Sequence, residues 1–291
     1  MALAWTMDKI GPICRSAEDC ALVMQAIYGP DGVDLTVHPA PFLWDARADW
    51  KRLKIGYAKS LFEIQSLPDN PPDYLTTDEL KEWESKKDDR AAAEARSAYD
   101  RTYDQAALDA LRKMGVELHE IELPDLPLDA IALLLNAEAA AAFADLTLSG
   151  RDQLLKEQGP DDWPNVFRAA RFYPAVEYIQ ANRARALAMR RMAELFADVN
   201  VIVVPSNSDS QLILTNLAGH PAVIMPNGFR GEDAPKSPPV DTGEDDRIGG
   251  PGTPDSLTFL GRLYNDSALL AFASAYQQET GFHRFHPPEF E

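Results

Sequence analysis

Four consecutive β-branched residues at positions 201–204, Val-Ile-Val-Val, constrain the fold more than any other stretch of this chain. A run without polar alternation is typical of a strand buried on both faces, as in sheets that helices cover on each side. Pro205 and a polar segment at residues 206–210 follow it directly. We therefore predict an α/β fold with a mixed, largely parallel sheet covered by helices on both faces.

Signals for strands and helices alternate along the rest of the chain. Strand patterns occur at residues 53–57, 116–123, 221–226 and 257–259. Apolar spacing predicts helices at residues 105–114, 128–148, 174–197 and 266–280. One more helix is predicted to begin after Ser16, because Ser16 and Asp19 form a capping pair. Its predicted apolar face holds Cys20, Val23, Met24, Ile27 and Tyr28.

Three stretches depart from this alternation. Residues 66–104 are dense in Asp, Glu, Lys and Arg, which indicates a charged helical insertion, with a hairpin or a partner-binding arm as alternatives. Residues 230–254 are rich in Gly, Pro and Asp, which favours a flexible surface loop. Residues 160–173 are predicted to be irregular. Length alone allows one or two domains.

Composition excludes several classes of partner. The formal net charge of −18 argues against binding to a nucleic-acid backbone, which needs a basic face. No stretch approaches the about 18 uninterrupted apolar residues of a membrane span. Cys14 and Cys20 lack the spacing of a zinc site, and we interpret both as packing residues; no metal or cofactor is predicted. The compartment stays open, with the cytoplasm favoured.

Residues 5–19 read Trp-Thr-Met-Asp-Lys-Ile-Gly-Pro-Ile-Cys-Arg-Ser-Ala-Glu-Asp. This string resembles the segment W-[ST]-x-D-x-x-G-P-[ML]-x-R-[ST]-x-x-D of the amidase signature family, with Ile13 where the family usually has Met or Leu. Residues 215–223 resemble the family's late N-L-x-G-x-P-A motif, and residues 256–276 resemble its closing strand and helix. The resemblance implies that residues 1–291 form the C-terminal portion of a single amidase-signature-like domain.

The resemblance also implies that reactive groups are missing from this chain. The family uses a Ser nucleophile, a second Ser in a cis peptide and a Lys, all upstream of the segment that matches here. A Ser hydroxyl needs a nearby base to take its proton, and the oxyanion needs donors already aimed at it. The sequence contains neither Gly-Ser-Ser nor Gly-Gly-Ser. We therefore expect a truncated amidase that is inactive alone, with no catalytic residue of its own and with Lys9 structural or exposed.

Three functions stay open at this point. The parent protein is expected to hydrolyse carboxamide C–N bonds through a Ser acyl-enzyme, with a small-molecule amide as substrate. One alternative is the glutamine amidase subunit of a tRNA-dependent amidotransferase. The other is a non-catalytic binding or assembly module that has kept the scaffold. Homodimer formation is left open.

Polar residues after the buried strand are the candidate substrate-binding groups. Asp209 is predicted in the loop that follows this strand, and Thr215 and Asn216 in the turn before the next one. Ligand sites in open α/β sheets cluster at the carboxyl ends of strands, and the resembling family places substrate-pocket groups in this region. In the alternative interpretation, these side-chain oxygens cap a turn.

Overall fold

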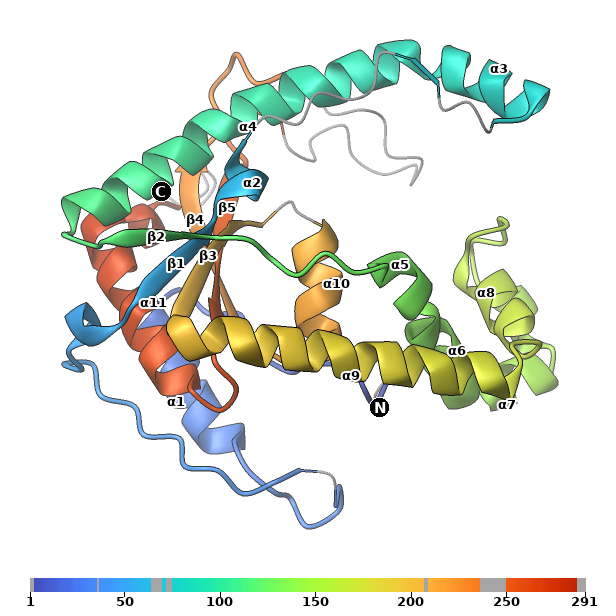
Figure 1. Cartoon of the computed structure of the whole chain (residues 1–291), viewed down its shortest axis with the longest axis horizontal. Helices are drawn as coiled ribbons and strands as arrows, with labels where there is room; N and C mark the ends of the chain where they lie inside the picture. The colour runs from blue at the N-terminus through green and yellow to red at the C-terminus, as the bar shows by residue number, and fades with distance from the viewer. Residues whose placement is uncertain are drawn as a thin grey trace.

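The computed structural model describes residues 3–35, 37–63, 70–71, 75–206, 209–235 and 250–286, with only the backbone described for residues 78, 79, 82, 209 and 210. Five strands form one sheet in the order β2-β1-β3-β5-β4 (Figure 1). They are β1 (Ile55–Ala58), β2 (Leu118–Ile121), β3 (Val201–Pro205), β4 (Ala222–Phe229) and β5 (Pro254–Gly261). β1 pairs in parallel with β2 and β3, whereas β5 runs antiparallel between β3 and β4. Four of these five strands therefore point the same way, which confirms the predicted mixed, largely parallel sheet.

The strand β3 lies at the centre of the sheet and separates two hydrophobic clusters. All five of its residues are buried. Val201 and Val203 pack into the cluster on one face, and Ile202 and Val204 into the cluster on the other. Successive side chains of a strand point to opposite faces, so a strand with a cluster on each side needs apolar residues throughout. This explains the uninterrupted β-branched run.

Helices cover both faces of the sheet. The first cluster includes residues of α1 (Ala17–Ile27), α4 (Lys87–Lys113) and α11 (Asp266–Thr280). The second includes residues of α5 (Leu128–Ile131), α6 (Leu133–Ala142), α9 (Ala175–Asp198) and α10 (Asp209–Ala218). The shorter helices are α2 (Lys59–Phe62), α3 (Thr77–Ser85), α7 (Ala144–Leu148) and α8 (Trp163–Ala170), with 3-10 turns η1 (Trp50–Arg52), η2 (Arg151–Leu154) and η3 (Phe282–Arg284).

The capping of α1 is confirmed, but its predicted buried face is wrong. Ser16 Oγ accepts from Asp19 N–H at 3.0 Å and donates to Asp19 Oδ2 at 2.7 Å. The fully buried side is formed by Ala17 and Ala21, which allow α1 to pack closely on α11. Val23 and Ile27 are exposed instead. The contact with α11 is made by small residues, and the spacing of large apolar residues does not indicate them.

Several predicted boundaries are also wrong. The later part of the charged stretch, from Lys87, and the helix predicted from residue 105 form one continuous helix, α4, which ends before Gly115 at φ 86°. The single helix predicted at residues 128–148 is three helices, α5, α6 and α7, and the irregular segment at 160–173 contains α8. Cys14 is exposed, so it is not a packing residue, whereas Cys20 packs partly into the core.

The strand β4 forms one edge of the sheet rather than a short buried strand. Its residues range from buried to exposed, and Ile224 is 65% exposed. Within the described ranges, no helix combines the length and apolar character needed to cross a membrane.

Candidate functional site

The carboxyl ends of β1, β2 and β3 meet at one edge of the sheet because these strands are parallel. Lys59, which follows β1, places Nζ 3.1 Å from Glu120 Oε2. Tyr57 donates to the other carboxylate oxygen of Glu120 at 3.3 Å. The hydrogen bond with Lys59 lowers the pKa of Glu120 and raises that of Lys59. Both side chains face solvent, so this pair contributes little to stability.

Ser206 directly follows β3 at the same edge and carries a hydroxyl group. Its Oγ lies 2.7 Å from Thr258 Oγ1 on β5, and its N–H donates to Ser256 O at 3.3 Å. Its side-chain partner is another hydroxyl rather than a base. Among the described residues, Ser206 is therefore held beside the sheet by Thr258, and no base lies within hydrogen-bonding distance of its hydroxyl.

The helix α10 carries all three predicted substrate-binding residues. Asp209 is its first residue, so the predicted loop after β3 is shorter than expected. Thr215 and Asn216 lie within the helix rather than in a turn. Thr215 is 1% exposed, and its hydroxyl donates to Leu212 O at 3.2 Å, so this side chain belongs to the core. Asn216 is half-buried.

Helical geometry places positions 209 and 216 on the same side of α10, but not position 215. Positions seven apart lie on the same side of a helix, separated by about 10 Å along the axis. Thr215 comes one residue earlier and projects from a different side. Asp209 and Asn216 thus define one side of α10 that begins at the carboxyl end of β3, and a substrate-binding role for the three residues stays a prediction.

The segment at residues 3–13, which carries the first part of the family-like string at residues 5–19, is tied to the helices behind the sheet. Glu138 on α6 is buried and accepts from Thr6 N–H at 3.0 Å, Thr6 Oγ1 at 2.9 Å and Tyr178 Oη at 3.0 Å. Arg185 on α9 donates to Thr6 O at 3.0 Å and to Leu217 O at 2.7 Å. The guanidinium of Arg185 thus joins this segment to α10.

Lys9 clamps the end of α10. Its Nζ donates to His220 O at 2.9 Å, just beyond the helix, where a cation complements the partial negative charge of the last carbonyls. Burial lowers the pKa of Lys9 to about 8. This contact is in line with the structural role predicted for Lys9.

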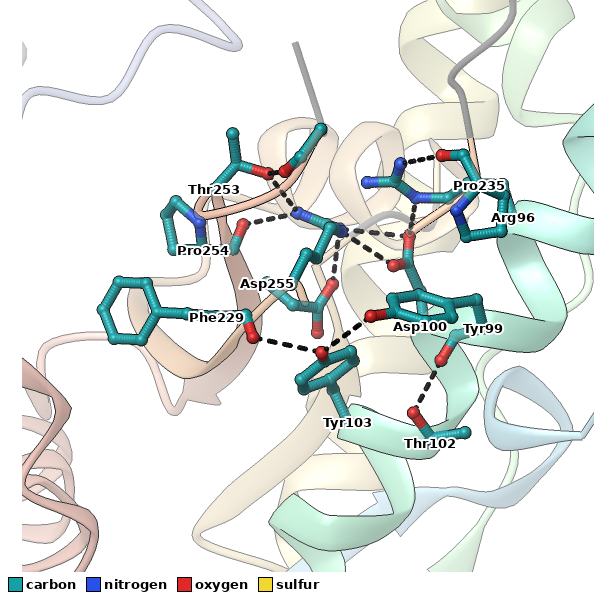
Figure 2. Close-up of polar contacts among 12 residues, drawn as sticks. Arg96, Tyr99, Asp100, Thr102, Tyr103, Phe229, Pro235, Thr253, Pro254 and Asp255 are labelled. Carbon is teal, nitrogen blue, oxygen red and sulfur yellow. Dashed lines mark hydrogen bonds and ion pairs between the residues drawn. The ribbon is translucent and has the colours of Figure 1, made fainter. Parts of the chain in front are cut away.

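A buried ionic cluster gave no signal in the sequence. Arg230 was predicted in the flexible surface loop, yet it is buried and pairs with Asp100 on α4 and Asp255 on β5 (Figure 2). Residues 236–249 of that loop lie outside the described residues. No local pattern links partners so far apart in the sequence, so only the fold could reveal them. Among the described side chains, no group of three or more His, Cys, Asp or Glu residues is arranged to hold a metal ion.

Curated relatives match the chain from end to end, although no family model does. The chain is 28% identical to a glutamyl-tRNA(Gln) amidotransferase subunit from Roseiflexus sp., over 99% of this chain and 57% of that protein. It is 25% identical to the protein of the same name from Pseudomonas entomophila, over 100% of this chain and 59% of that protein.

Solved structures show the same fold. A bacterial aryl acylamidase described as an amidase signature enzyme superposes with a TM-score of 0.61 and 15% identity, over 94% of this chain and 53% of its own. The chain is related to the amidase signature enzymes. An amidase family protein from Bacillus anthracis gives a TM-score of 0.63 and 18% identity, over 99% of this chain and 51% of its own. The chain thus has the amidase signature fold and spans little more than half the length of the relatives it matches.

Proposed function

We propose that this chain supplies the scaffold and one wall of the substrate pocket of an amidase, which hydrolyses a carboxamide C–N bond through a Ser acyl-enzyme. The observation that carries this proposal is the end-to-end match to proteins named as amidotransferase subunits, over 99% of the chain. In this proposal, the nucleophilic Ser, the second Ser and the Lys lie outside the 291 residues, which form the C-terminal portion of one domain. The lack of any Gly-Ser-Ser string and the hydrogen bonding of Ser206 support it.

The pocket wall in this proposal is the side of α10 that carries Asp209 and Asn216. A carboxylate and an amide are suited to bind the N–H groups of an amide or an ammonium group on the substrate. The start of α10 also lies beside the carboxyl end of β3, where ligands bind in open α/β sheets. Thr215 is expected to support this wall from the core, since its hydroxyl is already bonded within the helix.

The reading frame upstream of residue 1 tests the proposal at the level of the gene. An in-frame Gly-x-Ser-x-Gly-Gly-Ser string with an earlier Lys is expected. The longer protein made from that frame should release ammonia from a carboxamide, and Asp209→Ala should raise its KM more than the control Asp198→Ala at the end of α9. Stop codons directly upstream of a functional ribosome-binding site would instead favour a non-catalytic module.

The second candidate function is the glutamine amidase subunit of a tRNA-dependent amidotransferase. The names of the curated relatives favour it, because they are subunits of such an enzyme. This candidate predicts that glutamine is hydrolysed only when a partner protein is present. An amidase of the first kind should act on a carboxamide without a partner, so ammonia release with and without co-purified proteins separates the two.

A further inference from the structure

Two stretches that interrupt the regular α/β pattern, the charged helix α4 and the segment after β4, meet in one buried cluster (Figure 2). Arg230 follows β4 directly, and its side chain is only 6% exposed. Its guanidinium donates to Asp100 Oδ1 at 2.8 Å, to Asp100 Oδ2 at 3.0 Å and to Asp255 Oδ1 at 2.8 Å. One buried cation therefore ties α4 to β5.

Aromatic residues of α4 fix how this helix lies on the edge strand β4. Tyr103 donates from its hydroxyl to Phe229 O at 3.0 Å, and Tyr99 Oη accepts from Gly231 N–H at 3.0 Å. The ring of Tyr103 lies so close to Gly228 that an added Cβ there would overlap with it. α4 thus has one close-fitting position on the sheet. The arm, which we define as α3 and the first turns of α4, projects beyond the sheet from this position (Figure 1).

In this cluster, the described hydrogen-bond donors do not satisfy every buried carboxyl oxygen. Asp255 Oδ2 is buried without a hydrogen-bond partner among the described residues, and the Asn227 amide lies beside Asp255 but outside hydrogen-bonding geometry. Asp104 is buried on α4, and its cationic partner Arg101 lies at 3.8 Å, which is long for a charge-assisted hydrogen bond. A buried carboxylate without donors is costly, and taking up a proton is the usual relief.

The groups that face Asp104 and Asp255 come from every element packed on the cluster. They are Asp100 and Arg101 on α4, Asn227 on β4, Arg230 after β4, and Tyr276 on α11. Behind them, Arg96 donates to Asp100, and Tyr103 lies near Arg230. The guanidinium groups favour the ionised carboxyls, whereas burial and the neighbouring carboxylates oppose ionisation. Burial, followed by the charge of a neighbouring Asp, raises the pKa of Asp104 to about 7 and that of Asp255 to about 6.

We propose that this cluster is a proton-operated latch for α4. While the pair Asp104 and Asp255 holds a proton, α4 lies against β4 and β5, and loss of that proton loosens α4 together with the arm. A carboxyl with a higher pKa in the latched state binds more protons there, so raising the pH favours release. With a pKa of about 7 for Asp104 in the latched state, the ratio of latched to released molecules falls about tenfold between pH 6 and pH 8.

Hydrogen exchange of the purified chain at pH 6 and pH 8, corrected for intrinsic exchange, tests the latch. Protection of amides at residues 96–104 is expected to fall about tenfold at the higher pH. In Asp104→Asn this pH dependence is expected to shrink to about twofold, which is the part that Asp255 contributes. Asp109→Asn is the matched control, because Asp109 is an exposed residue of the same helix paired with Arg112, and it should behave as wild type.

Two results would overturn the latch. One is equal protection of residues 96–104 at both pH values in the wild-type chain. The other is the same pH dependence in Asp104→Asn as in the wild type. If Asp104→Asn does not fold, carboxyl NMR titration of the wild-type chain decides the matter: apparent pKa values above about 6 for the pair support the latch, and ordinary values near 4 contradict it.

Discussion

Removing the buried carboxylate of Glu138 should detach the N-terminal segment from the core. Glu138 is 2% exposed and accepts from Thr6 N–H, Thr6 Oγ1 and Tyr178 Oη. Glu138→Ala leaves these three donors without their acceptor, at a cost of about 1–3 kcal/mol for each buried group. Relief of the buried charge offsets part of this, so we expect a net loss of about 3–5 kcal/mol in the free energy of unfolding.

Urea denaturation with linear extrapolation measures this loss as a shift of the midpoint at constant slope. Glu194→Ala is the matched control, since Glu194 lies on α9 in an exposed pair with Arg191 and should change stability by less than about 0.5 kcal/mol. Tyr178→Phe removes one donor and should cost about 1 kcal/mol. A loss below about 1 kcal/mol in Glu138→Ala would show that this carboxylate does not hold the segment.

Three further expectations concern the α4 contact, pH and exposed apolar surface. Gly228→Ala should lower the free energy of unfolding by about 2 kcal/mol, because its Cβ overlaps with the Tyr103 ring. In a thermal melt, adding Tyr103→Ala to this variant should relieve most of that overlap. An unchanged melting temperature in Gly228→Ala alone would contradict the structure. The free energy of unfolding should fall as pH rises from 5 to 8, because the folded-state pKa values of Asp104 and Asp255 lie above the unfolded value and the folded chain loses protons in this window; flat urea midpoints across the window would refute this. The purified chain should bind a hydrophobic dye or self-associate, because β4 is an edge strand and its residue Ile224 is exposed to solvent. A monodisperse, dye-negative monomer would argue against this expectation.

The sheet could be predicted because its strongest signal is local. A strand buried on both faces needs apolar residues at every position, and Val201 to Val204 meet this need without help from distant residues. The cap of α1 is local as well, since Ser16 and Asp19 satisfy each other. Such features follow from a few neighbouring residues, so they are visible before the fold is known.

Features that depend on distant partners could not be predicted. Arg230 reads as part of a polar loop until the fold brings Asp100 and Asp255 to it. Glu138 reads as a polar break in an apolar helix until Thr6 and Tyr178 supply donors. A charged residue is assigned to the surface by default, and only its partners show that burial is compensated.

The local structure predicted for the candidate residues Thr215 and Asn216 is wrong, and their substrate-binding role stays a prediction. Thr215 and Asn216 precede a glycine and a strand, which suggested a turn, yet they form the last turn of α10 before Gly219. Helical periodicity decides which polar residues of α10 lie on the same side of the helix, and this requires the helix to be known first.

The central claim is that these 291 residues provide the supporting part of an acyl-transfer site whose nucleophile lies elsewhere. The most direct test is to incubate the purified chain with glutamine and with simple carboxamides, and to measure ammonia release over time. We expect no release above the buffer rate and no covalent labelling by a Ser-directed phosphonylating reagent. Sustained ammonia release that is blocked by this reagent, or by Ser206→Ala, would contradict it.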